Sequence, residues 1–283
     1  MEFTVNGNEI FIPTSPDFNP QQTLECGQVF RFKTTAFGYE VYSLNHKATI
    51  ICQKDGTKIV CDDVKYFINY FDLLTDYAKI KLQLRKNAFL KDAISFGEGI
   101  RILKQNSIEA IISFLISQNN NIPRIKKIIE TICESYGEKC DGYYAFPTLE
   151  KLKTIPKQFF TDIKCGYRDE YLYSTIQSLA NGFDIQKIKQ MSANDANVYL
   201  TKLKGVGNKV ADCILLYGFY KTDVFPTDTW IKKVYADYNP ENKNKTAIQI
   251  RNEFVSVYGN LSGYAQQYLF YSKREKIINQ GEK

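Results

Sequence analysis

The hydrophobic pattern of this chain changes its period near residue 63, and this change constrains the fold more than any other feature. Before it come short segments rich in β-branched and aromatic residues: EIFIP (9–13), VFRFK (29–33), YEVYSL (39–44) and ATIICQ (48–53). Within KDGTKIVC (54–61), Asp55 and Gly56 supply a typical hairpin turn. Residues 1–62 are therefore predicted to form the strands of a small antiparallel sheet.

Beyond residue 63 the apolar residues recur at helical spacing, first in DDVKYFINYFDL (62–73) and NAFLKDAISFG (87–97). Asn106 and Glu109 form a capping-box pattern at the start of a helix whose centre is apolar on most sides, so this helix is expected to be buried. Further helices are predicted near 122–136, 149–154, 169–181, 192–203, 208–219, 228–237, 245–258 and 263–276. The prediction is an α+β fold, with a β-sheet-rich subdomain at 1–98 and a mainly α-helical body at 99–283.

Composition limits the classes of function. The net charge of +6 permits a polyanionic partner but does not demonstrate one. The seven cysteines are odd in number and contain no C-x-x-C, as expected for a reduced intracellular protein, and none lies in the last 70 residues, which excludes a C-terminal four-cysteine iron–sulfur cluster. The single histidine, His46, is expected to be an ordinary surface or core residue. No apolar run is long enough to span a membrane, and the polar N-terminus is unlike a signal peptide.

The segment LKGVGNKVADCILLYGF (203–219) predicts two helices joined by a tight turn. Gly205 and Gly207 would allow positive φ and a close approach of the backbone. The second helix would begin near Asn208, where its free N–H groups could receive a phosphate oxygen. This is a helix-hairpin-helix pattern, which grips the DNA backbone without reading sequence, although a purely structural glycine turn accounts for the same residues.

Lys209 lies where a helix N-terminus disfavours a cation. It shares one helix face with Cys213, Leu216 and Tyr217, and that face carries no second charge. Loss of hydration and the helix dipole would both lower the pKa of the amine, and a neutral amine is a nucleophile that can form a Schiff base. Lys209 could equally extend to solvent or contact a phosphate, and the helix alone leaves these alternatives open.

Asp228 stands where another helix begins, directly after the segment FPT (225–227). As an N-cap it would need no further role. A carboxylate held by helix N–H groups also stays ionised, so that near a lysine it could stabilise a cationic sugar or help to deprotonate the amine. The two interpretations are compatible.

Taken together, these residues resemble the helix-hairpin-helix (HhH-GPD) DNA glycosylase superfamily, and most of all its 8-oxoguanine DNA glycosylase/AP lyases. The motifs that carry the resemblance run in order along most of the chain: ECGQVFRF (25–32), FGEGIRILKQNSIEAIISFLISQNNNIPRI (96–125), CGYRDEYL (165–172), LKGVGNKVADC with FPTD (203–213 and 225–228) and GYAQQYLF (263–270). Five ordered motifs are far more specific than any one of them.

The resemblance implies a bifunctional reaction on duplex DNA that contains 8-oxoguanine. The damaged nucleotide would be flipped out of the stack, and Lys209 would attack C1′, release the base and leave an imine from which β-elimination nicks the strand. Asp228 matches the catalytic aspartate of the family. No metal or organic cofactor is required, and a monovalent cation bound by hairpin carbonyls in the DNA complex is compatible with the family.

The resemblance also assigns the residues that would read the base. Gly27 matches a glycine whose carbonyl accepts a hydrogen bond from N7–H, an atom that normal guanine lacks. Gln266 would bind the Watson–Crick edge, while Phe270 and Cys213 would pack on opposite faces of the base. Tyr217 stands in this pocket where relatives usually have methionine. Without the resemblance, these would be a turn glycine, a surface amide and core residues.

On the opposite strand, the resemblance assigns Asn119 to the vacated space, Arg124 and Arg168 to an opposing cytosine, and Tyr167 to a wedge between bases. By residue type alone, these belong to a loop and a turn at the surface. Trp230 departs from the histidine that eukaryotic members commonly place near the 5′ phosphate, although an indole N–H could still donate. Gly205, Gly207 and Trp230 are thus the expected contacts to the DNA backbone.

Two alternatives follow from the same residues. One is a related glycosylase for alkylated bases or mispaired adenine, but monofunctional relatives lack the lysine, and the adenine type usually carries iron–sulfur cysteines. The other is a non-enzymatic DNA-binding module, which would need neither Lys209 nor Asp228. The short, non-basic N-terminus and the composition rich in Lys, Asn, Ile and Tyr lead us to expect a monomeric bacterial enzyme, cytoplasmic and associated with the nucleoid.

Overall fold

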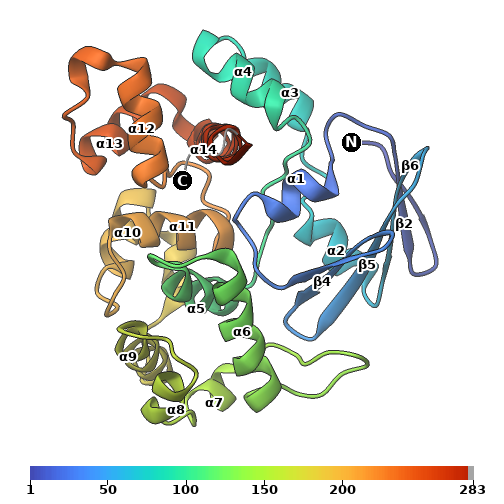
Figure 1. Cartoon of the computed structure of the whole chain (residues 1–283), viewed down its shortest axis with the longest axis vertical. Coiled ribbons are helices and arrows are strands. Elements are labelled where there is room, and N and C mark those ends of the chain that lie inside the picture. Colours follow the sequence, from blue (N-terminus) through green and yellow to red (C-terminus); the bar gives the residue numbers. More distant parts are fainter. Residues whose placement is uncertain (280–283) are drawn as a thin grey trace.

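Alternating apolar residues in the first 61 residues build a six-stranded antiparallel sheet, shown in blue in Figure 1. The computed structural model describes residues 1–279, and its strands follow the order β1-β2-β6-β5-β4-β3. Their bounds are β1 (Thr4–Asn6), β2 (Glu9–Pro13), β3 (Phe32–Thr35), β4 (Gly38–Ser43), β5 (His46–Cys52) and β6 (Gly56–Cys61). The sheet is followed by a mainly helical body, which confirms the predicted α+β class.

The register of the strands aligns apolar side chains on one face of the sheet, and these side chains form its core. Ile50 of β5 pairs with Ile59 of β6, and Ile59 pairs in turn with Ile10 of β2, so one row of isoleucines crosses three strands. All three are fully buried. They form one hydrophobic cluster with Phe67 and Tyr70 of α2 (Val64–Tyr70). This cluster is distinct from the larger core of the helical body.

A short helix, α1 (Pro20–Glu25), interrupts the region that was predicted to contain only strands. The Asn19 side chain caps it by accepting a hydrogen bond from the Gln22 N–H at 3.0 Å, and Pro20 takes the first helical position, where its missing N–H costs nothing. The strand predicted at residue 29 begins only at Phe32. The intervening Phe30 turns into the helical core and packs edge-on against Phe114.

The helical periodicity gave most of the remaining elements correctly. These are α4 (Ala88–Phe96), α5 (Ser107–Ser117), α6 (Ile122–Tyr136), α7 (Leu149–Leu152), α9 (Arg168–Ala180), α10 (Ala193–Leu200), α11 (Asn208–Gly218), α12 (Thr229–Tyr238), α13 (Ala247–Tyr258) and α14 (Ser262–Asn279). Elements not predicted are α3 (Tyr77–Leu84), α8 (Lys157–Asp162) and the 3-10 turns η1 (Ile185–Gln190), η2 (Pro240–Asn242) and η3 (Gly259–Leu261). Residues 280–283 of the predicted helical region lie outside the described residues. No helix among residues 1–279 has the length and hydrophobicity needed to cross a bilayer.

The predicted capping box at α5 forms only in half. Asn106 caps the helix, accepting from the N–H groups of Ile108 and Glu109. The Glu109 carboxylate instead accepts from the Leu44 N–H at 3.0 Å and lies 3.9 Å from the buried Arg31 guanidinium. A buried carboxylate is stabilised more by a cation than by a cap N–H, so Glu109 ties the helical body to the sheet.

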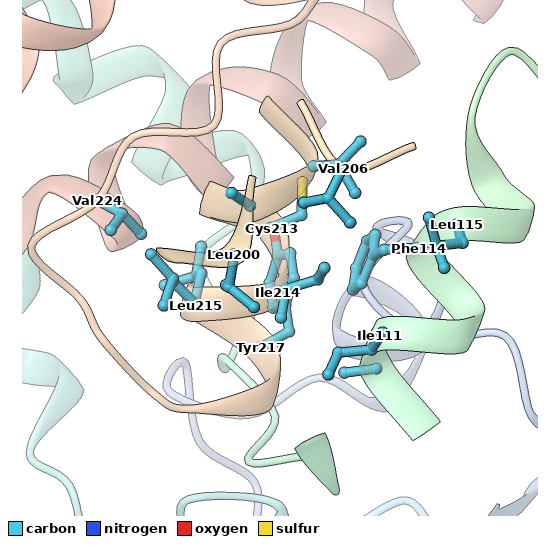
Figure 2. Close-up of a cluster of buried hydrophobic side chains, with 14 of the residues drawn as sticks. Ile111, Phe114, Leu115, Leu200, Val206, Cys213, Ile214, Leu215, Tyr217 and Val224 are labelled. Carbon is cyan, nitrogen blue, oxygen red and sulfur yellow. The ribbon is translucent and has the colours of Figure 1, made fainter. Parts of the chain in front are cut away.

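Helices α5 and α11 lie side by side in the centre of the body and face each other through apolar side chains (Figure 2). The rings of Phe114 on α5 and Tyr217 on α11 are stacked, with centroids 5.3 Å apart and an interplanar angle of 15°. Because both helices are buried along this contact, the N-terminal turn of α11, which carries Lys209, has a rigid support.

Candidate active site

Lys209 and Asp228 both line one cavity of about 230 Å³. Lys209 is the second residue of α11, and Asp228 is the N-cap of α12, whose Ile231 N–H donates to the carboxylate at 2.9 Å. The predicted cap at Asp228 is thus confirmed. The cap uses one carboxylate oxygen of Asp228, so the other oxygen remains available to a molecule in the cavity. Lys209 is partly buried in the wall of the same cavity.

The electrostatic prediction for Lys209 was wrong in sign. Its pKa is raised above the ordinary 10.5, because its electrostatic interactions with the Cys213 side chain, one helical turn on, and with the Asp228 carboxylate together outweigh burial. Burial raises the pKa of the Cys213 thiol to about 11 and raises the pKa of Asp228 above 3.8, against the opposing Ile231 N–H and Lys209. At neutral pH the free protein therefore holds Lys209 as an ammonium beside a thiol.

The structure brings every predicted base-reading residue to the walls of this cavity. Besides Lys209 and Asp228, the lining contains Gly27, Cys213, Tyr217, Gln266, Phe270 and Trp230. The Gln266 Oε1 atom is buried and has no hydrogen-bond partner among residues 1–279. A buried amide oxygen without a partner is costly, so the cavity offers an acceptor that a bound molecule could satisfy.

A wider hollow of about 850 Å³ adjoins the cavity and shares Lys209, Asp228 and Trp230 with it. Asn119 and Tyr167 also line this hollow. Tyr167 is half exposed, and its ring packs edge-on against Tyr171 with centroids 5.6 Å apart. Asn119 is exposed and has a positive φ of 45°. The predicted wedge and gap-filling residues are therefore at the surface beside the mouth of the cavity.

The two arginines assigned to cytosine lie near this hollow but are held by backbone carbonyls. Exposed Arg124 donates to the Lys164 carbonyl at 2.7 Å. Arg168 is only 3% exposed, and its guanidinium makes four hydrogen bonds to the carbonyls of Gln118, Asn119 and Cys165. In this conformation Arg168 braces the loop that carries Asn119.

The two hairpin glycines differ in backbone conformation and in the space available for a side chain. Gly205 has a φ of +85°, and a Cβ atom there would come within 2.3 Å of the Tyr171 ring, so this position needs glycine. Gly207 does not use this freedom, since it is the N-cap of α11 with an ordinary φ of −89°. A Cβ on Gly207 would meet nothing within 4 Å. No side chain caps α11, so its first N–H groups face the open surface next to Gly207.

Sequence reasoning missed several residues of the site. The unassigned residues in the cavity wall are Phe30, Phe114, Ser117, Asn120, Ile122, Ile125, Pro226 and Arg274. Arg274 follows Phe270 by four residues, so helical spacing could have placed it on the same face of α14. In the part of the chain that the structure describes, no three His, Cys, Asp or Glu side chains gather as a metal site would require.

Beneath the hairpin lies a buried polar network that the sequence did not indicate. Asp212 is fully buried and paired with Arg251 of α13, the closest contact being 2.5 Å from Nε. The Asn197 amide of α10 donates both to Asp212, at 2.7 Å, and to the Asn208 carbonyl, at 3.0 Å. The network thus holds the backbone immediately before Lys209.

Comparison with known proteins agrees with this arrangement. Residues 10–111 match the family model of the 8-oxoguanine DNA glycosylase N-terminal domain, and residues 112–259 match that of the HhH-GPD superfamily base excision DNA repair proteins. A probable N-glycosylase/DNA lyase of Methanothermobacter thermautotrophicus is 32% identical over 68% of this chain and 70% of its own length. The N-glycosylase/DNA lyase OGG1 of Arabidopsis thaliana is 28% identical over 88% of this chain and 75% of its own length.

Among solved structures, the fold is similar to that of the Clostridium acetobutylicum 8-oxoguanine glycosylase/lyase, solved in complex with double-stranded DNA containing cytosine opposite 8-oxoguanine. The TM-score is 0.91, with 35% identity and 98% of each chain covered. The chain therefore belongs to the 8-oxoguanine DNA glycosylase family of the HhH-GPD superfamily of base excision DNA repair proteins.

Proposed function

We propose that this N-glycosylase/DNA lyase excises 8-oxoguanine from duplex DNA through a Schiff base on Lys209 and then nicks the strand. One observation carries the proposal: Lys209 and Asp228 converge on a cavity whose wall also holds the unpartnered Gln266 amide oxygen and the Phe270 ring. An amine, a carboxylate, a hydrogen-bonding amide and an aromatic face are what excision of a flipped base by an amine nucleophile requires.

In the proposed reaction the Lys209 amine attacks C1′ of the flipped nucleotide, and the glycosidic bond breaks with its electron pair passing to the leaving base. Because the raised pKa keeps Lys209 protonated in the free protein, a proton must first leave the ammonium. Asp228 is the only carboxylate that lines the cavity within the described residues. It accepts this proton or stabilises the cationic sugar. β-Elimination from the resulting imine removes a proton from C2′ and breaks the C3′–O bond, so that the 3′ phosphate leaves and the strand is nicked.

We propose that the base is read by the residues assigned above. The Gly27 carbonyl accepts from N7–H, and Gln266 binds the Watson–Crick edge. Phe270 and Cys213 then enclose the two faces of the base, with Tyr217 at the inner wall. The proposal is supported by the position of all five residues in the lining of one cavity.

We assign the contacts to the DNA strands to residues in and around the wider hollow of about 850 Å³. Gly207, Trp230 and the free N–H groups of α11 are the proposed backbone contacts, while Tyr167 and Asn119 enter the duplex. Recognition of cytosine by Arg124 and Arg168 requires Arg168 to exchange carbonyl partners for the base.

The hairpin also offers a place for a monovalent cation. Within residues 1–279 no hydrogen bond ends on the Gly205 or Val206 carbonyl, so these oxygens are the candidates to hold such an ion when DNA is bound. The reaction itself uses no metal or organic cofactor in this proposal. A monomeric state and a place in the bacterial cytoplasm at the nucleoid stay predictions.

The test is borohydride trapping on a duplex with 8-oxoguanine opposite cytosine. The wild type should become covalently linked to the DNA, and Lys209→Gln should lose the adduct while retaining binding. Lys202→Gln is the matched control, since Lys202 is an exposed lysine directly before the hairpin that does not line the cavity. Survival of the adduct in Lys209→Gln would overturn the assignment of the nucleophile.

The same assay, combined with a measurement of base release, separates the two alternatives. A non-enzymatic DNA-binding module would bind the duplex and yield no adduct with any substrate. A glycosylase for alkylated or mispaired bases would release those bases from matched duplexes faster than 8-oxoguanine.

A further inference from the structure

Two side chains of α14 donate hydrogen bonds to backbone carbonyls of the Glu25–Gly27 segment. The Gln267 Nε2 atom donates to the Cys26 carbonyl at 3.2 Å, and Arg274 donates from Nη2 to the Glu25 carbonyl at 2.5 Å. These residues are seven apart in one helix and therefore lie on the same face. Two consecutive carbonyls of the segment are thus held by a single rigid element.

The other end of the Gln267 amide is also engaged. The Tyr217 hydroxyl donates to Gln267 Oε1, and both side chains are buried. The Tyr217 ring is in turn stacked on Phe114, so the hydroxyl has little freedom to move. Because the Cys26 carbonyl can only accept, the amide must turn Nε2 toward it, and Oε1 is then left to accept from the Tyr217 hydroxyl. We name the chain Tyr217–Gln267–Cys26 the amide relay.

The residue next in sequence, Gly27, presents a free acceptor. No hydrogen bond among the described residues ends on its carbonyl oxygen. Its φ of +85° turns the peptide sharply, and a Cβ atom would lie 2.9 Å from the Arg274 guanidinium and 3.5 Å from the Phe270 ring. The direction of the Gly27 carbonyl therefore depends on where the preceding Cys26 peptide is held.

We infer that the amide relay positions the Gly27 carbonyl, and that Tyr217 and Gln267 thereby determine how strongly the enzyme prefers 8-oxoguanine to guanine. The inference rests on the base-reading role proposed above for Gly27. Discrimination at this atom depends on a hydrogen bond from N7–H in one case and on two opposed acceptors in the other. Hydrogen bonds and acceptor repulsion both weaken steeply with distance and angle, so a carbonyl free to turn away discriminates less.

The test measures dissociation constants of forms that carry Lys209→Gln, so that no base is excised. Three duplexes are compared: 8-oxoguanine opposite cytosine, guanine opposite cytosine, and a stable abasic analogue. Adding Gln267→Met should lower the preference for 8-oxoguanine over guanine about fivefold or more, the value of one net hydrogen bond. Affinity for the abasic analogue, which has no base to read, should not change.

Two further variants isolate the relay from general packing. Gln267→Glu keeps the acceptor for Tyr217 but removes the donor to Cys26, so it should lose the preference as Gln267→Met does. Tyr217→Phe deletes the hydroxyl and should lower the preference in the same direction. Tyr268→Phe is the matched control, because Tyr268 is also a buried tyrosine of the same core, and its hydroxyl has no partner in the described part of the chain. This variant should leave the preference unchanged.

The outcomes separate the relay from the function on which it rests. An unchanged preference in Gln267→Met and Gln267→Glu would overturn the relay alone. Equal weakening on all three duplexes would also overturn it, because that is the signature of a purely structural side chain. If the parent Lys209→Gln shows no preference for 8-oxoguanine over guanine, the proposed base reading fails and the relay fails with it.

Discussion

Lys209 and Asp228 face the same cavity from the starts of two successive helices, α11 and α12. A helix N-terminus attracts an anion and repels a cation, so the two residues stand in opposite relation to their own helices. Asp228 is held by the Ile231 N–H, whereas Lys209 is stabilised as an ammonium by its neighbours rather than by its helix. The two helix starts therefore bring a cation and a carboxylate to the wall of the same cavity.

Asp228→Asn should abolish most base excision without unfolding the protein. Asparagine is as good an N-cap as aspartate, so α12 keeps its start. It cannot accept the Lys209 proton or stabilise a cationic sugar, and we expect single-turnover excision to fall by about two to four orders of magnitude. Affinity for the damaged duplex should persist. An unchanged rate would leave Asp228 as a cap and nothing more.

The same substitution should slightly stabilise the protein at neutral pH. The pKa of Asp228 is raised on folding, so the folded state favours its protonated form, and the ionised form present at pH 7 costs free energy of folding. Asparagine resembles the protonated form and removes that cost. Thermal unfolding should therefore occur at a higher temperature for Asp228→Asn than for wild type at pH 7, and the difference should shrink as pH falls through the folded pKa.

The pH profile of excision follows from the groups in the cavity. Asp228 must be ionised, so the rate should rise with pH through an acid limb whose midpoint lies above 3.8, the ordinary pKa of aspartate. Lys209 must lose its proton before it attacks. Because its pKa is raised above 10.5, a rise in pH increases the fraction of neutral amine, and with it the excision rate. The Cys213 thiol, with a pKa of about 11, does not ionise near neutrality. Single-turnover rates should therefore not fall between pH 7 and 9, and a descending limb there would contradict these assignments.

Much of the fold could be predicted because long helices carry their own periodicity. The prediction of 122–136 for α6 matches its observed bounds. Helix α1 could not be found this way, because it has only six residues and depends on contacts far along the chain. The Asn19 N–H donates to the Gly99 carbonyl at 2.9 Å, and so does the Thr23 hydroxyl at 3.1 Å. Tertiary contacts of this kind override local propensity.

The site was only partly accessible to reasoning from local pattern. The rules for helix starts singled out Lys209 and Asp228, since both stand at helix N-termini. The same rules do not give the direction of the Lys209 pKa shift, because helix position and burial leave out the Cys213 side chain one turn on and the Asp228 carboxylate of the next helix. Gly27 and Phe270 lie more than 240 residues apart yet share one cavity wall, a proximity that only family resemblance could suggest.

Alanine at the two hairpin glycines should have opposite consequences. Gly205→Ala places a methyl group against the Tyr171 ring at a positive φ, so we expect it to destabilise the hairpin by about 1–3 kcal/mol. Gly207→Ala meets open space at an ordinary φ and should leave the free energy of unfolding almost unchanged. Because Gly207 faces the proposed DNA backbone, its variant should weaken binding to undamaged duplex. Denaturant unfolding and filter binding would measure the two effects, and equal stability losses would contradict this distinction.

Arg251 should matter for stability through the charge that it neutralises. Arg251→Met leaves the fully buried Asp212 carboxylate without its cation, and removal of one partner from a buried pair costs about 3–5 kcal/mol. The loss should be larger at pH 8 than at pH 5, because an unpaired buried carboxylate can escape its charge by protonation only at lower pH. Adding Asp212→Asn should restore part of the stability. A loss that is independent of pH would show that Arg251 acts by packing alone.

The two arginines proposed to recognise cytosine should differ in role: Arg124 contributes to base recognition alone, whereas Arg168 also supports the loop backbone. Arg124 is exposed and has one backbone contact, so Arg124→Gln should preserve stability and reduce the preference for cytosine over adenine opposite 8-oxoguanine. Arg168 holds the Gln118 and Asn119 carbonyls, so Arg168→Gln should lower stability as well as cytosine preference. Single-turnover rates with each of the four opposing bases, measured beside thermal unfolding, would test this division. If Arg124→Gln leaves the order of the four rates unchanged, Arg124 does not read cytosine, and discrimination at that position must come from elsewhere.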